Sequence, residues 1–351
     1  MNKRFDTLVV IGRFQPVHNA HAEMIRRAME LSKQVVIIVG SAKQPRTYKN
    51  PFTSDERTSM LINVVADIKF EQHGMTDPGC KLKIEPNIDT IYNNQAWAIR
   101  IQEAVAKHTM PGDKIGLIGH DKDDTTWYLK MFPQWERVEI PLIEPLNATN
   151  VRDLYFREDV NMNFITGVVP ASVADFLVRF KHTPDYEQII RERKFVEMYK
   201  KQFAGLAYPP IFVTSDAVVI QSGHVLMIMR RSEPGKGLWA LPGGFVNAAT
   251  DRSVKGAMLR ELREETGIKV PKPVLDGSIQ DNKVFDAIDR SARGRTITHA
   301  FKIVLPDGPL PKVKGMDDAE KAQWIPIAEV KSENCFEDHF EIIQWALGAS
   351  K

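Results

Sequence analysis

The sequence predicts an α/β protein of two domains, the first built around a doubly wound parallel sheet. Short apolar runs in its first half alternate with amphipathic segments, and such runs are typical of strands buried on both faces of a parallel sheet. The predicted strands are Leu8–Ile11, Val35–Val39, Ile115–Ile118 and Val138–Leu142, and the predicted helices are Ala22–Leu31, Glu56–Ile62 and Ala96–Ala106. At 351 residues the chain is also long for a single domain.

After about residue 170 this alternation gives way to two consecutive helical segments, Ala171–Phe180 and Pro184–Phe203, and the string Tyr208-Pro209-Pro210 ends the second. Beyond it we predict strands at Phe212–Ile220, Val225–Arg230 and Thr296–Leu305 and helices at Ser253–Thr266 and Phe340–Leu347. The chain is therefore divided into a first domain at residues 1–181, a helical linker at 182–208 and a second domain at 209–351.

The composition narrows the class of protein. The formal net charge is +2, and no long Lys/Arg tract occurs, so we expect no nucleic acid as partner. The two cysteines, Cys80 and Cys335, lack the paired spacing of a zinc site and are interpreted as reduced thiols. The polar start of the chain has no signal-peptide pattern, and no apolar segment is long enough for a bilayer. We expect a cytoplasmic protein without a membrane partner.

The most informative stretch of the first domain is the turn between its first strand and first helix, residues 12–21, which read GRFQPVHNAH. It carries Arg13 and two histidines three residues apart, His18 and His21. The N–H groups at a helix N-terminus favour anions, and imidazoles add donors for a phosphate whose charge moves during a reaction. Two histidines at this spacing are also common as surface or capping residues, so the pair alone leaves both interpretations open.

This turn resembles the His-x-Gly-His signature of the nucleotidylyltransferase superfamily, with Ala20 in the glycine position. Its GRFQP string resembles the nicotinamide mononucleotide (NMN) adenylyltransferases of the archaeal type. We expect Ala20 to be helical with negative φ, where alanine is acceptable. The resemblance implies a Rossmann-like first domain in which Gly12, Phe14 and Gln15 bind substrate.

Two further strings resemble segments of the same family. Residues 147–152, NATNVR, resemble its second signature, in which a hydroxyl and an arginine, here Thr149 and Arg152, hold the triphosphate. Read without the family, Asn147 or Thr149 could merely cap a helix. Residues 50–57, NPFTSDER, resemble the segment after the second strand, which implies a substrate contact for Arg57. Their plain interpretation is a helix start with Thr53 or Ser54 as the N-cap.

The remaining matches concern the acceptor. Asn93 and Trp97 stand where the family binds and stacks the nicotinamide ring, although a lone tryptophan more often packs in a core. Asp121 lies in the turn after the strand at Ile115–Ile118. In a doubly wound sheet such turns converge on one crevice outside the carboxyl ends of the strands.

The resemblance implies a reaction that joins ATP and NMN into NAD with release of pyrophosphate. The 5′-phosphate of NMN would attack the α-phosphorus directly, so no protein nucleophile is required. Catalysis then consists of alignment and of stabilising the charge on the leaving pyrophosphate. The residues expected in that role are His18, His21, Arg13 and Arg152, with Mg²⁺ shielding the triphosphate.

The second half contains a glycine loop, LPGGF at residues 241–245, followed by RELREETGI at 260–268. Glu261, Glu264 and Glu265 would share one face of a helix, where like charges repel unless a divalent cation binds them. Three glutamates alone are more often a solvated helix face. Arg260 can orient Glu264, which lies four residues later.

Together the two strings resemble the Nudix box, Gly-x5-Glu-x7-Arg-Glu-apolar-x-Glu-Glu-x-Gly-apolar, and imply an α/β/α Nudix sandwich. The second part of the box matches at every fixed position. In the first part, the position of the first glutamate falls on Arg252, and Gly244 lies two residues too early. A two-residue insertion within residues 247–251 explains this and offers Asp251 as the substitute carboxylate.

Neighbouring strings resemble the ADP-ribose pyrophosphatases, which implies hydrolysis of ADP-ribose to AMP and ribose 5-phosphate. The resemblance assigns Glu261 and Glu265 as ligands of Mg²⁺ or Mn²⁺, with Glu264 as an auxiliary ligand that also takes part in catalysis. Phe245 and Arg260 are expected to bind substrate. Glu320 is the candidate general base, expected on a later loop.

Both halves together resemble bifunctional adenylyltransferase–Nudix proteins, whose ligands would be ATP, NMN, NAD and ADP-ribose. The main alternative makes the second domain a sensor that binds an NAD-related nucleotide without cleaving it, because its box is altered. A transferase with another phosphate-bearing acceptor is disfavoured by the GRFQP string and Trp97. A DNA-binding regulator lacks a helix-turn-helix pattern or basic patch. Assembly into a homo-oligomer stays open.

Overall fold

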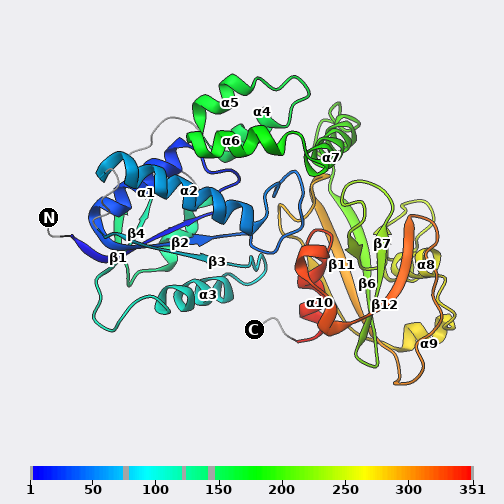
Figure 1. The fold of residues 1–351 in the computed structure, drawn as a ribbon. Helices are drawn as coiled ribbons and strands as arrows, with labels where there is room; N and C mark the ends of the chain where they lie inside the picture. Colours follow the sequence, from blue (N-terminus) through cyan, green and yellow to red (C-terminus); the bar gives the residue numbers. More distant parts are fainter. Residues whose placement is uncertain (1–2, 74–78, 121–123, 141–146, 349–351) are drawn as a thin grey trace. The chain divides into compact units, whose positions relative to one another are not determined.

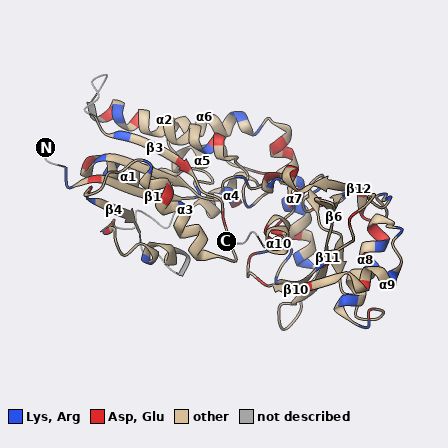
Figure 2. Cartoon of the chain, turned by 90° about the horizontal axis from the view of Figure 1, so that it is seen from below, with Lys and Arg blue, Asp and Glu red and all other residues tan. Residues whose placement is uncertain are grey.

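A computed structural model describes residues 3–73, 79–120, 124–140 and 147–348. The chain forms two compact units, Met1–Ile190 and Arg191–Lys351, and each is described by itself (Figure 1). The division falls inside helix α7 (Pro184–Lys201), within the predicted linker. Among the described residues, no helix combines the length and apolar character needed to cross a bilayer. Figure 2 shows basic and acidic residues interspersed on the helices of both units.

The first unit contains a five-stranded sheet in the order β3-β2-β1-β4-β5, and all its neighbouring strands are parallel. Its strands are β1 (Phe5–Gly12), β2 (Ser32–Val39), β3 (Lys81–Pro86), β4 (Ile115–Gly119) and β5 (Glu136–Glu139). The doubly wound sheet is thus confirmed. The prediction missed β3, an edge strand whose lysines and partly exposed side chains give no apolar run. It also placed β5 too late, since that strand ends at Glu139.

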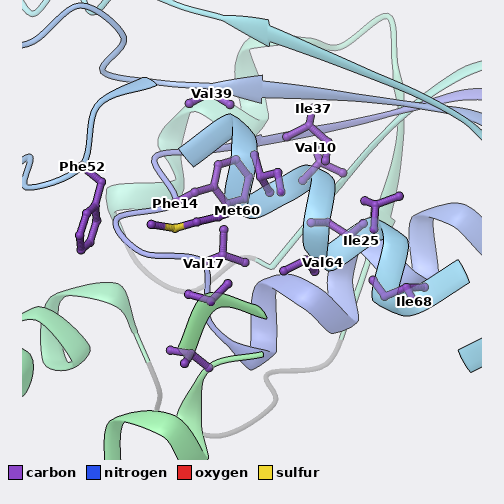
Figure 3. Close-up of a cluster of buried hydrophobic side chains, with 14 of the residues drawn as sticks. Val10, Phe14, Val17, Ile25, Ile37, Val39, Phe52, Met60, Val64 and Ile68 are labelled. Carbon is purple, nitrogen blue, oxygen red and sulfur yellow. The ribbon is translucent and has the colours of Figure 1, made fainter. Parts of the chain in front are cut away.

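Helices cover both faces of this sheet. They are α1 (Asn19–Leu31), α2 (Ser54–His73), α3 (Asn94–Ala106), α4 (Ala148–Tyr155), α5 (Met162–Val168) and α6 (Ala171–Phe180), with a 3-10 helix at Asp124–Met131. Successive strand residues point to opposite faces. Val10 and Ile37 therefore pack with Ile25 of α1 and Met60 of α2 (Figure 3). Their neighbours in the strands pack with α3 on the other face.

The strand order reverses between β1 and β4. Chains leaving these two strands run to opposite sides, which opens a crevice at their carboxyl ends. The turns after Gly12, Val39 and Gly119 all lie at this edge, because the three strands are parallel. The first unit therefore brings the predicted signature segments to one side of the sheet.

The second unit is a mixed sheet in the order β10-β11-β6-β7-β12, with β8 paired to β7 and β9 to β6. Its strands are β6 (Phe212–Gln221), β7 (His224–Arg230), β8 (Trp239–Ala240), β9 (Gly243–Phe245), β10 (Ile279–Phe285), β11 (Thr296–Val304) and β12 (Ala319–Pro326). β11 and β6 are parallel, and the other neighbouring strands are antiparallel. The short β8 and β9, together with β10 and β12, were absent from the prediction.

Helix α8 (Val254–Thr266) packs Met258 and Leu262 against Ala217 and Val219 of β6. The predicted helix Ser253–Thr266 is confirmed, with Ser253 as its N-cap and Gly267 ending it at a left-handed φ of 56°. The small helix α9 (Lys272–Gly277) follows, and 3-10 turns at Ile327–Glu329 and Ser332–Asn334 precede α10 (His339–Ala346). Asp216 points to the face opposite Ala217 and lines a pocket with His339, so α10 begins on that second face.

Candidate functional sites

The two histidines of the first turn form a stacked pair. His18 is the N-cap of α1 with an extended backbone, and its N–H donates to Nδ1 of His21 at 3.3 Å. The ring centroids are 3.7 Å apart with an angle of 27° between the planes. Ala20 lies inside α1 and is not among the residues with positive φ, as expected. The helical backbone therefore accepts alanine where the family signature has glycine.

Burial keeps His21 uncharged. Its enclosure lowers the pKa of the imidazole well below the ordinary value of 6.5, and the neighbouring His18 lowers it further. The ring of Phe14 also meets His21 edge-on, with centroids 4.9 Å apart. At neutral pH the imidazole of His21 is a hydrogen-bonding group without net charge.

The residues just before the histidines build the turn itself. Phe14 is buried at a φ of 53°, and its Cζ would lie 2.8 Å from a Cβ on residue 12, which explains the need for Gly12. The Gln15 amide is fully buried, and it donates to the carbonyl of Phe52 and accepts from the N–H of Phe52, both at 2.9 Å. The side chains of Phe14 and Gln15 are thus used within the protein, which leaves only their backbones for the substrate contacts predicted from the sequence.

The second signature lies against this turn. Arg152 is buried in α4, and it donates from Nη1 to the Gln15 carbonyl at 2.9 Å and from Nη2 to Oγ1 of Thr149 at 3.0 Å. Asn147 caps the same helix by accepting from the N–H of Asn150 at 2.9 Å. The capping interpretation therefore holds for Asn147, while Thr149 and Arg152 are brought to the first turn as the resemblance implies.

Arg57 ties two turns of the crevice together. Its buried guanidinium donates to the carbonyls of Arg13 and Gly40, each at 2.6 Å, and to that of Ser41 at 3.0 Å. The helix it belongs to starts at a capping box in which Thr53 and Glu56 bond reciprocally, so Thr53 rather than Ser54 is the cap. Sequence resemblance assigned Arg57 to the substrate, whereas the structure commits its side chain to the backbone.

Three guanidinium groups gather at the carboxyl edge of the sheet. Burial, together with the charge of Arg13, lowers the pKa of Arg57 and of Arg152 to about 10 each. Both therefore remain protonated at neutral pH, and Arg13 is the exposed member of the group. Such a group of fixed positive charges attracts and holds a polyanion.

An aromatic cluster borders Arg13. Trp97 is half-buried, with ring centroids 5.7 Å from Trp127 and 5.9 Å from Tyr128. Burial raises the pKa of Tyr128, and the nearby Arg13 lowers it, which places this phenol beside the arginine. Trp127, which is 42% exposed, was missed by the sequence analysis, and its neighbouring aromatics between residues 127 and 135 were the available signal.

Asn93 and Asp121 are the other two residues predicted on the acceptor side. Asn93 caps α3 by accepting from the N–H of Ala96 at 2.9 Å, so its side-chain oxygen serves the helix. Asp121 lies outside the described residues. His120, directly before it, is half-buried, and its Nδ1 lies 3.0 Å from the carbonyl oxygen of Ile140.

In the second unit the glycine loop contacts two of the three predicted glutamates, Glu261 and Glu265. Glu265 accepts a hydrogen bond from the Gly243 N–H at 2.8 Å, and Oε1 of Glu261 lies 2.6 Å from where a Cβ on residue 244 would be. Burial raises the pKa of Glu265 to about 8, with added repulsion from Glu261 and Asp216. The pKa of Glu261 is also raised, mainly by burial. Like charges in a poorly solvated place favour binding of a hard cation.

Glu264 does not join this pair. Its side chain is 47% exposed and meets Arg260 at 2.8 Å. Among the residues that the structure describes, no three carboxylate, imidazole or thiolate groups are already gathered as a metal site would require. Of the three glutamates expected as cation ligands, Glu261 and Glu265 lie at the glycine loop, whereas Glu264 is the most exposed and is paired with Arg260.

Asp251, the candidate substitute carboxylate, pairs with Arg260. Both of its oxygens accept from Arg260, Oδ1 from Nε at 3.0 Å and Oδ2 from Nη2 at 2.8 Å. This ion pair lowers the pKa of Asp251 to about 2. Arg260 also pairs with Glu261 at 2.8 Å. Its guanidinium therefore contacts three acidic side chains, those of Asp251, Glu261 and Glu264, and holds the segments of the box together.

Comparisons with known proteins find relatives for each half of the chain. A cytidylyltransferase-like family model matches residues 9–228, and a NUDIX domain model matches residues 211–346. The chain is 36% identical over 188 residues to the nicotinamide/nicotinic acid mononucleotide adenylyltransferase of Acinetobacter baylyi, covering 53% of this chain and 92% of that protein. It is 31% identical over 141 residues to the ADP-ribose pyrophosphatase of Methanocaldococcus jannaschii, covering 40% and 73%.

One solved structure matches across both units. It is the bifunctional NMN adenylyltransferase/ADP ribose pyrophosphatase from Francisella tularensis, 33% identical, with a TM-score of 0.88 over 99% of this chain and 100% of that chain. The chain belongs to this bifunctional family. A second structure from the same organism, described as complexed with AMP and a manganese ion, matches with a TM-score of 0.87 and 32% identity over 99% and 100% of the two chains. The two units are accordingly an adenylyltransferase domain and a Nudix domain.

A pocket of the Nudix domain opens beside its glycine loop. Phe245, a residue predicted to bind substrate, lines this pocket, and the guanidinium of Arg293 lies 4.9 Å from the centre of the Phe245 ring. Asp216 and Glu337 also line it, and burial raises the pKa of both carboxyls. The sequence analysis missed Arg293, Asp216 and Glu337, since none of them belongs to the box.

Glu320 is placed otherwise than expected. It is an exposed residue of β12, beside the irregularity between Ala319 and Lys321, rather than a residue of a loop. It does not line the pocket. The sequence analysis predicted no strand here, whereas β12 pairs antiparallel with β7 from Ala319 onward.

Proposed function

We propose that the adenylyltransferase domain transfers the adenylyl group of ATP to NMN, giving NAD and pyrophosphate. The observation that carries this proposal is the junction of the two signatures, where Arg152 bonds to the carbonyl of Gln15 beside the stacked His18 and His21. Arg13 and Arg152 present positive charge to the triphosphate, and the imidazoles present hydrogen-bonding groups. The attacking phosphate of NMN is already an anion, so these residues only need to hold and align the two reactants.

Mg²⁺ is the proposed cation for this reaction, and it would shield the triphosphate when bound. Trp97 and Trp127, whose ring centroids lie 5.7 Å apart, form the aromatic surface proposed for the nicotinamide ring, and Trp127 is 42% exposed. Incubation of the chain with ATP, Mg²⁺ and either NMN or nicotinic acid mononucleotide tests the proposal. NAD or its acid analogue should form together with pyrophosphate, and absence of both products would refute it.

The Nudix domain is proposed to hydrolyse ADP-ribose to AMP and ribose 5-phosphate. Its support is the pair Glu261 and Glu265, two crowded carboxylates under a glycine loop whose repulsion a bound cation would relieve. We propose Mg²⁺ or Mn²⁺ as that cation, which would activate the attacking water. The box lacks its first glutamate, and Asp251 is the proposed substitute for it, because its carboxylate pairs with Arg260.

The alternative function, a sensor that binds without cleaving, is separated from hydrolysis by one product assay. The chain is incubated with ADP-ribose and Mg²⁺ or Mn²⁺, and AMP is measured by chromatography. Hydrolysis predicts AMP in stoichiometric amounts with ribose 5-phosphate. Tight binding of ADP-ribose without AMP would reject it in favour of the sensor.

A further inference from the structure

The start of helix α10 reaches the glycine loop of the Nudix domain through one buried side chain. His339 is 5% exposed, and its Nδ1 accepts a hydrogen bond from the backbone N–H of Leu241 at 2.8 Å, across 98 residues of sequence. Leu241 is itself buried, two residues before Gly243. An acceptor must be supplied here, because a buried N–H without a partner is unfavourable.

His339 is suited to be a permanent acceptor. Burial lowers the pKa of its imidazole well below the ordinary value, and Arg290, Arg230 and Arg293 lower it further. The ring is therefore neutral at physiological pH. A neutral imidazole that accepts at Nδ1 carries its proton on Nε2, so the lone pair that faces Leu241 is retained.

The segment that carries His339 is firmly anchored. Asp338 makes two hydrogen bonds with Arg290, at 2.7 and 2.9 Å, and both side chains are 2% exposed. The N–H of Phe336 donates to the carbonyl of Trp239 at 2.8 Å. These contacts fix the imidazole relative to β8 and to the loop that follows it.

The loop transmits this position to a proposed cation ligand. Strand β6 holds the loop from the other side, where the N–H of Ala217 donates to the Pro242 carbonyl at 2.8 Å and Asp216 pairs with Gly243. Gly243 then donates its N–H to Oε2 of Glu265 at 2.8 Å. His339 and β6 therefore hold the backbone of residues 241–243 from its two sides, and the N–H of Gly243 in that backbone orients the carboxylate of Glu265.

We infer that His339 is a positioning residue for the cation site of the Nudix domain, acting on Glu265 through the Leu241–Gly243 backbone. This inference rests on the proposed role of Glu261 and Glu265 as cation ligands. It assigns to the C-terminal helix a part in metal binding that the box alone does not contain. The imidazole, which also lines the pocket, acts on the cation site only through this backbone in the assignment.

The test compares two substitutions in the full chain. In His339→Asn the amide oxygen stands where Nδ1 stood and can accept from Leu241, whereas His339→Leu fills the space without an acceptor. Binding of Mn²⁺ is measured directly from the loss of the free-ion electron paramagnetic resonance signal. His339→Leu should weaken Mn²⁺ binding about tenfold, and His339→Asn should restore it to within about threefold of wild type. His224→Leu, at the far end of β7, is the matched control.

Two further measurements separate positioning from general loss of structure. The first is the adenylyltransferase activity together with the thermal unfolding midpoint of each variant, which reports whether the chain is folded. The second is a double-mutant cycle with Glu265→Gln, in which His339→Leu should have no further effect on Mn²⁺ binding, because its influence passes through Glu265. Equal Mn²⁺ affinity in wild type and His339→Leu would overturn the inference, as would an undiminished effect in the Glu265→Gln background.

The proposed hydrolysis can fail without affecting this result. If wild type binds Mn²⁺ but releases no AMP from ADP-ribose, the proposed function is wrong, and the affinities of the two His339 variants still decide the inference. If wild type hydrolyses ADP-ribose and His339→Leu needs no more Mn²⁺ than wild type for half-maximal activity, the function holds and the positioning role is wrong.

Discussion

Arg152 donates a hydrogen bond of 2.9 Å to the backbone carbonyl of Gln15, which lies 137 residues earlier in the chain. The bond joins helix α4 to the turn that follows β1, and both groups are buried. Gln15 in turn brackets Phe52 through two hydrogen bonds, so the contact extends to the segment before α2. One guanidinium therefore both carries charge to the crevice and fixes the turn that holds the histidines.

Replacing Arg152 should separate these two roles. Arg152→Lys keeps the charge but lacks the second arm that reaches Thr149, and Arg152→Gln loses the charge as well. We expect adenylyl transfer to fall about 10-fold in the lysine variant and at least about 100-fold in the glutamine variant. Steady-state NAD formation measures both. Hydrolysis of ADP-ribose by the other domain should be unchanged, and a lysine variant as slow as the glutamine variant would assign the loss to the turn rather than to charge.

His21 should act as a neutral imidazole. Because burial lowers its pKa below 6.5, the ring stays uncharged as the pH falls from 8 through 6.5, and protonation occurs only at more acidic pH. The pH profile of kcat for NAD formation should therefore show no inflection near 6.5 that His21→Ala removes. His21→Ala should lower kcat about 100-fold and change the KM for NMN far less. Equal loss in both parameters, or none, would count against a role in the transition state.

Gly244 should be required for hydrolysis of ADP-ribose but not for folding of the Nudix domain. A Cβ on this residue would lie 2.6 Å from Oε1 of Glu261, so Gly244→Ala must displace that carboxylate. We expect at least about a 100-fold loss of AMP formation, with the domain still folded because a side-chain end can move. Gly277→Ala is the control, since a Cβ there meets nothing within 4 Å. Retained hydrolysis in Gly244→Ala would show that Glu261 is not required where it now lies.

Asp251 should stabilise the Nudix domain in a pH-dependent way. Its pKa is about 2 in the folded chain against an ordinary 3.8, so the stabilisation is present above about pH 4 and is lost as the pH falls toward 2. Asp251→Asn should therefore be less stable than wild type at pH 7, and the difference should shrink below pH 4. Urea unfolding at several pH values measures it. A difference that is constant down to pH 2 would mean that the ion pair with Arg260 is not its source.

Substitution of Asp251 should also change the rate of ADP-ribose hydrolysis. Asp251→Glu can still pair with Arg260, whereas Asp251→Asn leaves Arg260 free to draw Glu261 away from the cation site. We expect AMP formation to fall about 10-fold in the asparagine variant and to be largely retained in the glutamate variant. Substitution of the exposed Arg252 by Gln, which removes the residue at the usual glutamate position, should have no effect.

Much of this molecule was readable from the sequence. The alternation of apolar runs with amphipathic segments predicted the parallel sheet, because burial on both faces leaves a strong signal at β1, β2 and β4. The turns after these strands were also placed correctly, since turns at the ends of parallel strands share one edge of the sheet. The edge strand β3 was not predicted, because its side chains are partly exposed and its sequence therefore lacks the apolar run that marks a buried strand.

The sequence by itself determined which chemical groups the two domains carry: the two histidines and arginines of one, and the paired glutamates of the other. Only the tertiary structure decided which of them are free to act. Arg57, Gln15 and Asn93 are hydrogen-bonded to backbone groups, Glu264 is exposed and paired with Arg260, and His339 accepts a hydrogen bond from the glycine loop. A motif specifies side chains locally, whereas a hydrogen-bond partner is selected by packing between elements far apart in the chain.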